Sequence, residues 1–145
     1  MPLHLIKLCV GCDSIRDLED WIKLKLKEKR KRGEKVEHIH RTRMVPKRAE
    51  ELIDGGSLFW VIRGELACRE NIRAVRPFVD KEGIGRCALV LGPKVVPVAP
   101  RPYRAFQGWR YLAAKDAPRD LEKAAPGATA MPEQMRRELR ELGLI

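Results

Sequence analysis

Residues 57–62 read SLFWVI, an unbroken apolar run of aromatic and β-branched side chains. Such a run is typical of a strand buried on both faces, and Asp54, Gly55 and Gly56 just before it supply the turn that bounds it. Residues 47–53 have the pattern of a short helix, with Pro46 at its first position, where the missing N–H costs nothing. The sequence therefore predicts a short helix, a tight turn and a central strand in succession.

The N-terminal part predicts a strand followed by a long helix. Residues 3–9 are rich in Leu and Ile and are interpreted as a buried strand. Ser14, followed three residues later by Asp17, resembles a capping box and begins a helix that runs to about Arg32. The helix carries one apolar stripe at helical spacing, formed by Ile15, Leu18, Ile22 and Leu26. Its last turns are almost wholly basic, Gly33 supplies the stop, and residues 36–45 predict the next strand.

The second half predicts mainly strands. Residues 65–75 fit a strand or a short helix, and the turn DKEGIG at 80–85 pairs this segment with residues 86–91 as a hairpin. Pro97, Pro100 and Pro102 indicate an edge strand or a surface loop, and regular structure resumes over 103–112.

The predicted fold class is α+β, with a mostly antiparallel sheet or a small β-barrel and flanking helices. Residues 1–112 form one α+β domain. Residues 113–129, rich in Ala, Pro and Gly, are a flexible connector, and residues 132–142 form a C-terminal amphipathic helix on or near the domain.

Composition limits the classes of protein. The chain has 145 residues and a net charge of +10, and no apolar run is long enough to span a membrane. The N-terminus does not look like a signal peptide, because no basic leader precedes its apolar stretch and an acidic cluster follows. Four cysteines are too few for a disulfide scaffold, so we expect a cytoplasmic protein with reduced thiols and no cofactor.

Cysteine and histidine offer two alternatives. Cys9 and Cys12 stand between a predicted strand and a helix start, which suits a redox pair, although the remaining chain has no clear thioredoxin-like βαβ order. The same pair would need two further ligands for zinc, from His38, His40, Cys68 and Cys87. A structural zinc site usually closes with a second tight pair, and Cys68 and Cys87 are far apart in sequence. The pattern therefore favours free thiols and no metal.

No catalytic motif is evident. The chain has only two serines, Ser14 and Ser57, and neither lies in a Gly-x-Ser-x-Gly elbow. Gly83-x-Gly85 lacks the Lys-Ser/Thr of a phosphate-binding loop.

The basic residues are the better candidates for function. Residues 22–48 contain twelve Lys or Arg and three acidic residues, nearly all of the excess charge. Arginine and lysine match phosphate, and aromatic rings stack on unpaired bases. The predicted partner is RNA or another polyanion. The predicted binding residues are Lys29, Arg30, Lys31, Arg32, Arg41, Arg43, Lys47, Arg48, Arg69, Arg104, Phe106, Trp109 and Arg110.

Four blocks of sequence carry a resemblance. They are MPLHLIKLCVGC at 1–12, RMVPKRAEELIDGGSLFWVIRGELACR at 43–69, RCALVL at 86–91 and FQGWRYL at 106–112. In these blocks the chain closely resembles a family of bacterial proteins of about this length, known as a domain of unknown function. The order of helix, Asp-Gly-Gly, strand and hairpins is also similar to the small barrels of the PUA-like group, which includes RNA-binding modules.

The sequence leaves three hypotheses open. The first is a nucleic-acid-binding module, most plausibly for RNA. The second is an enzyme on a nucleotide or nucleic-acid substrate in a PUA-like pocket, with Arg63, Glu65 and Arg69 as candidate polar residues. The third is a protein-interaction subunit that docks through the C-terminal helix. A pocket with convergent polar side chains would favour the second.

Overall fold

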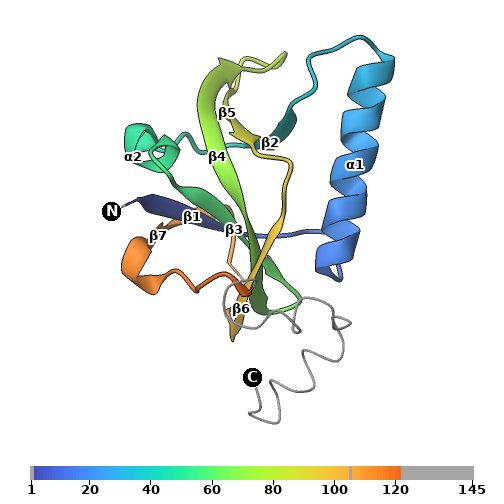
Figure 1. The fold of residues 1–145 in the computed structure, drawn as a ribbon. Coiled ribbons are helices and arrows are strands. Elements are labelled where there is room, and N and C mark those ends of the chain that lie inside the picture. Colours follow the sequence, from blue (N-terminus) through green and yellow to red (C-terminus); the bar gives the residue numbers. More distant parts are fainter. Residues whose placement is uncertain (1, 105, 122–145) are drawn as a thin grey trace.

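The computed structural model describes residues 2–104 and 106–121. Figure 1 shows a strongly twisted sheet with the long helix standing along one side. The elements in chain order are β1 (Leu3–Leu8), α1 (Ile15–Lys31), β2 (His38–Thr42), α2 (Ala49–Ile53), β3 (Ser57–Ile62), β4 (Glu65–Val79), β5 (Gly85–Leu91), β6 (Val96–Pro102), β7 (Trp109–Ala113) and the 3-10 helix η1 (Ala114–Asp116).

Within the described residues seven strands form one sheet in the order β2-β5-β4-β3-β1-β7, and β6 pairs with β4 beside this path. Every pair is antiparallel except β1 with β3. The predicted α+β class with a largely antiparallel sheet is therefore confirmed. The sequence did not predict the parallel pair. The chain between its two strands contains α1, β2 and α2, and so provides the long connection that parallel strands require.

The barrel alternative is wrong, because the sheet does not close. Its two end strands, β2 and β7, share no ladder of hydrogen bonds in the described part of the chain. The sheet nevertheless curls until its ends approach: the Trp109 indole Nε1 donates a 2.8 Å hydrogen bond to the carbonyl oxygen of Met44, two residues after β2. The curl follows from β4, which is 15 residues long and pairs with β3 and β6 through its first half and with β5 through its second.

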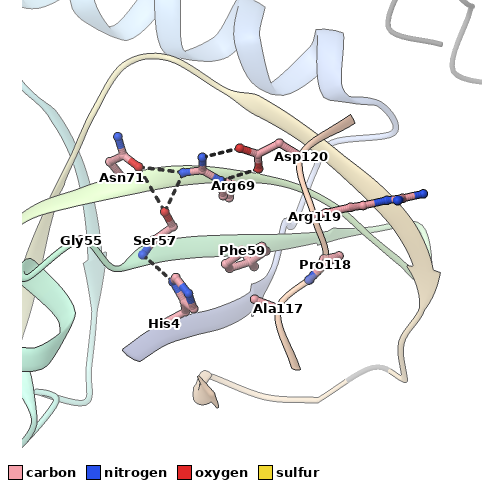
Figure 2. Close-up of a pocket in the computed structure, with 10 residues that line it drawn as sticks. All are labelled: His4, Gly55, Ser57, Phe59, Arg69, Asn71, Ala117, Pro118, Arg119 and Asp120. Carbon is pink, nitrogen blue, oxygen red and sulfur yellow. Dashed lines mark hydrogen bonds and ion pairs between the residues drawn. The ribbon is translucent and has the colours of Figure 1, made fainter. Parts of the chain in front are cut away.

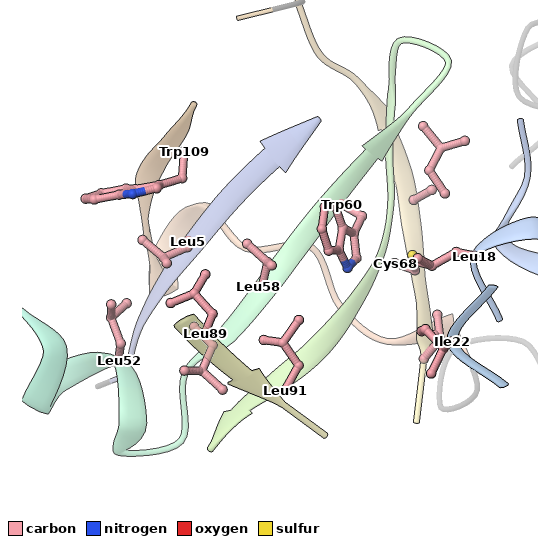
Figure 3. Close-up of a cluster of buried hydrophobic side chains, with 14 of the residues drawn as sticks. Leu5, Leu18, Ile22, Leu52, Leu58, Trp60, Cys68, Leu89, Leu91 and Trp109 are labelled. Carbon is pink, nitrogen blue, oxygen red and sulfur yellow. The ribbon is translucent and has the colours of Figure 1, made fainter. Parts of the chain in front are cut away.

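The strand predicted from SLFWVI is β3, with the predicted bounds, and all six of its residues are buried. It lies between β4 and β1, so the expectation of a central strand is confirmed. On one face of the sheet Leu58 and Trp60 join Leu5, Leu18 and Ile22 in the main hydrophobic core, shown in Figure 3. On the other face Phe59 and Val61 form a smaller cluster with Ile6, Leu66, Val98 and Leu112.

Helix α1 begins as its sequence predicts. Ser14 has an extended backbone, and its hydroxyl oxygen accepts a 3.1 Å hydrogen bond from the Asp17 N–H. The Asp17 carboxylate in turn accepts from the Asp13 N–H, at 3.0 Å. The first bond satisfies a donor that the helix start leaves unpaired, and the second fixes the residue before the cap. Leu18 and Ile22 are buried, and the basic last turn extends beyond the core.

One local prediction is corrected and one open alternative is decided. The short helix α2 begins at Ala49, so Pro46, which is itself buried, lies three residues before the helix and is not its first residue. Of the two alternatives predicted for residues 65–75, the strand is confirmed, because the segment pairs along both edges. The predicted hairpin with β5 is confirmed, with Val79 opposite Gly85.

The predicted connector is held to the domain at its start. Ala99 N–H donates to the Arg119 carbonyl oxygen at 2.8 Å, and Asp120 forms a bridge with Val98. These bonds tie Arg119 and Asp120 to β6. The flexibility predicted for residues 113–129 as a whole stays a prediction. The rest of the connector and the C-terminal helix over 132–142 lie outside the described residues. No helix in the described part is long and apolar enough to cross a membrane.

Candidate functional site

A pocket of about 540 Å³ lies between the start of α1 and the sheet. We call it the Trp60 pocket. Its wall combines thiols, imidazoles and indoles from four separate segments. The lining residues are Lys7, Leu8, Cys9, Val10, Gly11, Cys12, Asp17, Leu18, Trp21, His38, His40 and Trp60.

Glu70 lies behind this wall and is fully buried. Its Oε1 accepts a 2.9 Å hydrogen bond from the Trp60 indole, and its Oε2 lies 3.4 Å from Nε2 of His38. The second contact does not have hydrogen-bond geometry, and neither His38 Nε2, His40 Nε2 nor Glu70 Oε2 has another hydrogen-bond partner in the described residues. Buried polar groups are rarely left without partners, so this cluster is a candidate for contact with a ligand or water.

The surroundings of the pocket disfavour charge on His40 and Cys9. Burial, with smaller contributions from Lys7 and His38, lowers the pKa of His40 to about 4, so its imidazole is neutral at pH 7. Burial and the neighbouring Cys12 raise the pKa of the Cys9 thiol. Burial also lowers the pKa of the Lys7 ammonium.

The Trp60 pocket continues into a second depression of about 430 Å³ between α1 and β2, which we call the basic groove. The two share Trp21, His38 and His40. Lys25, Lys29, Arg32 and Arg41 line the groove, together with Glu28, Glu34, Glu37 and Ile39.

Three of the four cations are engaged within the groove. Lys25 lies 3.7 Å from Glu28, Arg32 lies 3.3 Å from Glu34, and Lys29 donates to the Glu37 carbonyl oxygen. Exposed pairs of this kind are weak and are easily exchanged for a phosphate. Glu37 itself is held by Arg76 of β4 in a two-point contact of 3.0 and 3.2 Å. Its charge is thus already compensated.

The structure brings only some of the predicted binding residues together. Lys29, Arg32 and Arg41 share the basic groove. Arg30 and Lys31 are exposed at the end of α1 but do not line the groove.

A second group lies at the other end of the curled sheet. Arg48 covers the ring of Tyr111 at 5.7 Å, and its N–H donates to the Tyr111 hydroxyl. Arg43 and Lys47 are exposed on the same segment before α2. Trp109 of this group is buried in the main core, so its ring is not available to stack on a base.

A third group lies on the opposite face of β7. Arg110 lies over the ring of Phe106 at 4.9 Å, and Phe106 packs against the smaller hydrophobic cluster. Arg104 is exposed nearby in sequence. Phe106 and Trp109 therefore belong to different faces of the sheet.

Arg69 lines a further pocket of about 560 Å³, which opens on the face of the sheet that bears the smaller cluster (Figure 2). Its guanidinium makes two 2.8 Å hydrogen bonds to the Asp120 carboxylate and also donates to Ser57 Oγ and Asn71 Oδ1. His4 Nδ1 accepts from the Ser57 N–H at 2.9 Å. All of the guanidinium nitrogens are thus used within the fold, and Arg69 acts as an anchor for the segment that contains Asp120.

The set of polar residues suggested for an enzyme does not converge. Arg63 is exposed in the tight turn between β3 and β4, with a positive φ of 49°, and does not line the pocket with Arg69. Glu65 is buried and is also absent from that lining. In the described ranges no three His, Cys, Asp or Glu side chains are close enough together to hold a metal ion. All four cysteines are free.

The family model for proteins of unknown function (DUF1489) matches residues 5–145. The chain belongs to this family. No curated protein and no solved structure matches it. The DUF1489 match covers nearly the whole chain, including both the Trp60 pocket and the basic groove.

Sequence reasoning missed two residues of this site. Trp21 is 43% exposed and stands on the flank of α1 between pocket and groove, with Lys25 at 5.6 Å from its ring. A Trp beside an apolar stripe, with Lys four residues later, is a signal that the sequence does contain. Glu70 gives no such signal, because its burial depends on strands that are distant in sequence.

Proposed function

We propose that the protein binds single-stranded RNA along the basic groove, with one unpaired base stacked at Trp21. The observation that supports this best is the continuity of groove and pocket: cations that suit phosphates lead to an exposed indole and then to an aromatic-walled cavity. This is the combination that proteins use for single strands, with charge following the backbone and rings stacking on bases.

Charge and geometry support the same assignment. Lys25 and Lys29 of α1 and its C-cap residue Arg32 are spaced three and four residues apart, so they follow one side of the helix. Arg41 approaches from β2 on the opposite wall, and no acidic partner is recorded for it in the described residues. A chain of phosphates laid between the two walls would meet cations from both.

Trp21 has the exposure that stacking requires. Its ring already makes an edge contact with His38, with ring centres 5.9 Å apart, which fixes its orientation. The lysine over its ring is exposed and can turn toward a phosphate instead. Beyond Trp21, the neutral His40 imidazole offers a hydrogen-bonding nitrogen without a described partner.

Binding is tested by fluorescence anisotropy with a labelled single-stranded RNA oligonucleotide over a series of salt concentrations. If three or four phosphates are neutralised, the slope of log affinity against log salt is about −2 to −3. The double variant Lys25→Glu, Arg41→Glu loses two ion contacts with the RNA, so its affinity should fall at least tenfold. A tenfold loss corresponds to about 1.4 kcal/mol in the free energy of binding. The double variant Arg30→Glu, Lys31→Glu is the matched control, with the same change in charge outside the groove.

Stacking is tested separately. Trp21→Ala should weaken binding by roughly 1 to 3 kcal/mol, whereas Trp21→Phe should retain most of the affinity because it keeps a ring. The groove assignment is refuted if both double variants lose affinity equally, or if the wild type does not bind at low salt. Equal affinity for the same sequence as DNA would refute the choice of RNA.

A further inference from the structure

Cys9 and Cys12 lie at the two ends of a short turn, and both line the Trp60 pocket. Both side chains are half-buried and pack against the main core. One is anchored by the sheet, since the Cys9 N–H donates to the Val61 carbonyl oxygen at 2.9 Å. The other lies two residues before the capped start of α1. A disulfide between the two ends of this four-residue turn requires only that the two thiols meet, and both already line the same cavity.

The turn between them permits this approach. Gly11 has a φ of +87°, a conformation that glycine adopts without strain, and an added Cβ would meet nothing within 4 Å. Val10 is 91% exposed and packs against nothing that would resist a small movement. The turn can therefore tighten without disturbing the core.

The surrounding fold supplies the context that the sequence did not reveal. The cysteine pair follows β1 and precedes α1, and β1 is parallel to β3, which the chain reaches after α1, β2 and α2. A Cys-x-x-Cys pair between a strand and the start of a helix is typical of redox-active dithiols. The parallel pair of β1 and β3 places this turn in a crossover connection that begins with α1.

The pocket also provides access. Cys9 and Cys12 line a cavity of about 540 Å³, large enough for a small thiol compound, with the Lys7 ammonium beside them. Cys68 and Cys87 are fully buried and line none of the cavities described here. Of the four cysteines, Cys9 and Cys12 are therefore the pair that shares an accessible cavity.

We propose that Cys9 and Cys12 form a redox-active dithiol that exchanges with low-molecular-weight disulfides at the Trp60 pocket. The thiolate of Cys12 attacks one sulfur of the small disulfide, and the other sulfur leaves as a thiol with one proton. Cys9 then attacks the Cys12 sulfur and releases the second thiol with the second proton. The protein loses two electrons and two protons, and the small disulfide gains both.

The order of attack follows from the environment. The raised pKa of Cys9 keeps that residue protonated. Cys12 is therefore assigned as the first nucleophile and Cys9 as the resolving thiol. This inference does not rest on RNA binding, and its test contains no RNA.

The experiment uses the full reduced chain in buffers with different ratios of oxidised to reduced glutathione, followed by alkylation under denaturing conditions and mass spectrometry. The wild type should keep two alkylatable thiols in oxidising buffer, and peptide mapping should place the disulfide between Cys9 and Cys12. Cys9→Ser should trap one glutathione on Cys12. Cys12→Ser should react no faster than the buried thiols. Cys68→Ala and Cys87→Ala are the matched controls and should exchange as the wild type does.

The proposal is overturned if four thiols remain alkylatable in every buffer, or if glutathione adds to Cys68 and Cys87 as readily as to the first pair. Elemental analysis of the same sample supplies the other decisive result. Stoichiometric zinc that is released when the first pair is alkylated would replace the redox assignment with a metal site.

Discussion

At the residue scale, His40 shows how a side chain with an ordinary sequence context acquires an unusual state. His38 and His40 lie two residues apart on β2, and both side chains project between α1 and the sheet. There the His40 ring makes an edge contact with the Trp60 ring, with ring centres 5.1 Å apart. The lack of solvent and the nearby Lys7 lower its pKa to about 4. A surface histidine would gain a proton at mildly acidic pH, but His40 stays neutral there.

This shift predicts a pH dependence of stability. The pKa of His40 in the folded state lies below its ordinary value of 6.5, so between these values the unfolded chain binds more protons. The stabilisation is therefore complete above pH 6.5 and is lost as the pH falls to 4. Chemical denaturation should show a loss of about 3 kcal/mol in the free energy of unfolding over this window.

The variant His40→Asn isolates this effect. It should flatten the pH profile, and the slope that remains should come from carboxylates and from His4, whose pKa burial and Arg69 also lower. Carboxylates that titrate in the same range act equally in both proteins. Parallel pH profiles for the wild type and the variant would contradict the assignment.

At the scale of elements, the joint between α2 and β3 determines how three elements meet. The Gly56 N–H donates to the Leu52 carbonyl oxygen at 2.9 Å, and its own carbonyl oxygen accepts from the Ile72 N–H at 3.0 Å. A Cβ at Gly56 would lie 2.2 Å from the Leu3 carbonyl oxygen and 2.3 Å from that of Leu52. Position 56 therefore requires a glycine because β1, α2 and β4 approach so closely that a side chain has no room. The backbone φ is not the reason.

Gly56→Ala should consequently destabilise the fold severely. The atoms in the way are backbone atoms of β1 and α2, which cannot move without breaking the joint, so we expect a loss of about 3 kcal/mol or more. The control is Gly85→Ala at the start of β5, where an added Cβ meets nothing within 4 Å. Thermal unfolding measures both. Similar melting temperatures for the two variants would show that the joint can relax.

At the scale of the whole molecule, the Arg69–Asp120 pair connects the C-terminal side of the described chain to the sheet. The pair is bidentate, both side chains are about four-fifths buried, and it raises the pKa of the Arg69 guanidinium. With the bond from Ala99 to Arg119 it holds residues 117–120 across the smaller hydrophobic cluster.

Trypsin measures how firmly this segment is held. Lys115 and Arg119 would be early cleavage sites in a free connector, but in this fold cleavage requires local opening. Asp120→Asn removes the charge and should speed cleavage at these sites about tenfold, which corresponds to roughly 1.4 kcal/mol in the opening equilibrium. Glu82→Gln in the β4–β5 turn is the control and should leave these rates unchanged. Rapid cleavage in the wild type at the same rate as in Asp120→Asn would mean that the pair contributes nothing.

The local structure could be predicted well because neighbouring residues determine it. The apolar run of β3, the Ser14 cap, the stripe of α1 and the hairpin turn after Val79 each depend on residues within a few positions of one another. The concentration of positive charge over residues 22–48 is likewise a property of composition. The predicted α+β class followed from the order of these elements.

What the tertiary structure decided concerns residues that are distant in sequence. The predicted basic residues lie on separate surfaces of the molecule. Trp109 is buried in the core, and Arg69 anchors the segment that contains Asp120. These positions follow from the curl of β4 and the order of the strands. The same packing buries Glu70 behind Trp60 and brings the Cys9–Cys12 turn, His38 and His40 to one pocket. Sequence by itself determined which segments are strands and helices, since that depends on local periodicity. Only the fold decided which side chains meet, since burial and proximity arise from pairing between strands that the sequence separates.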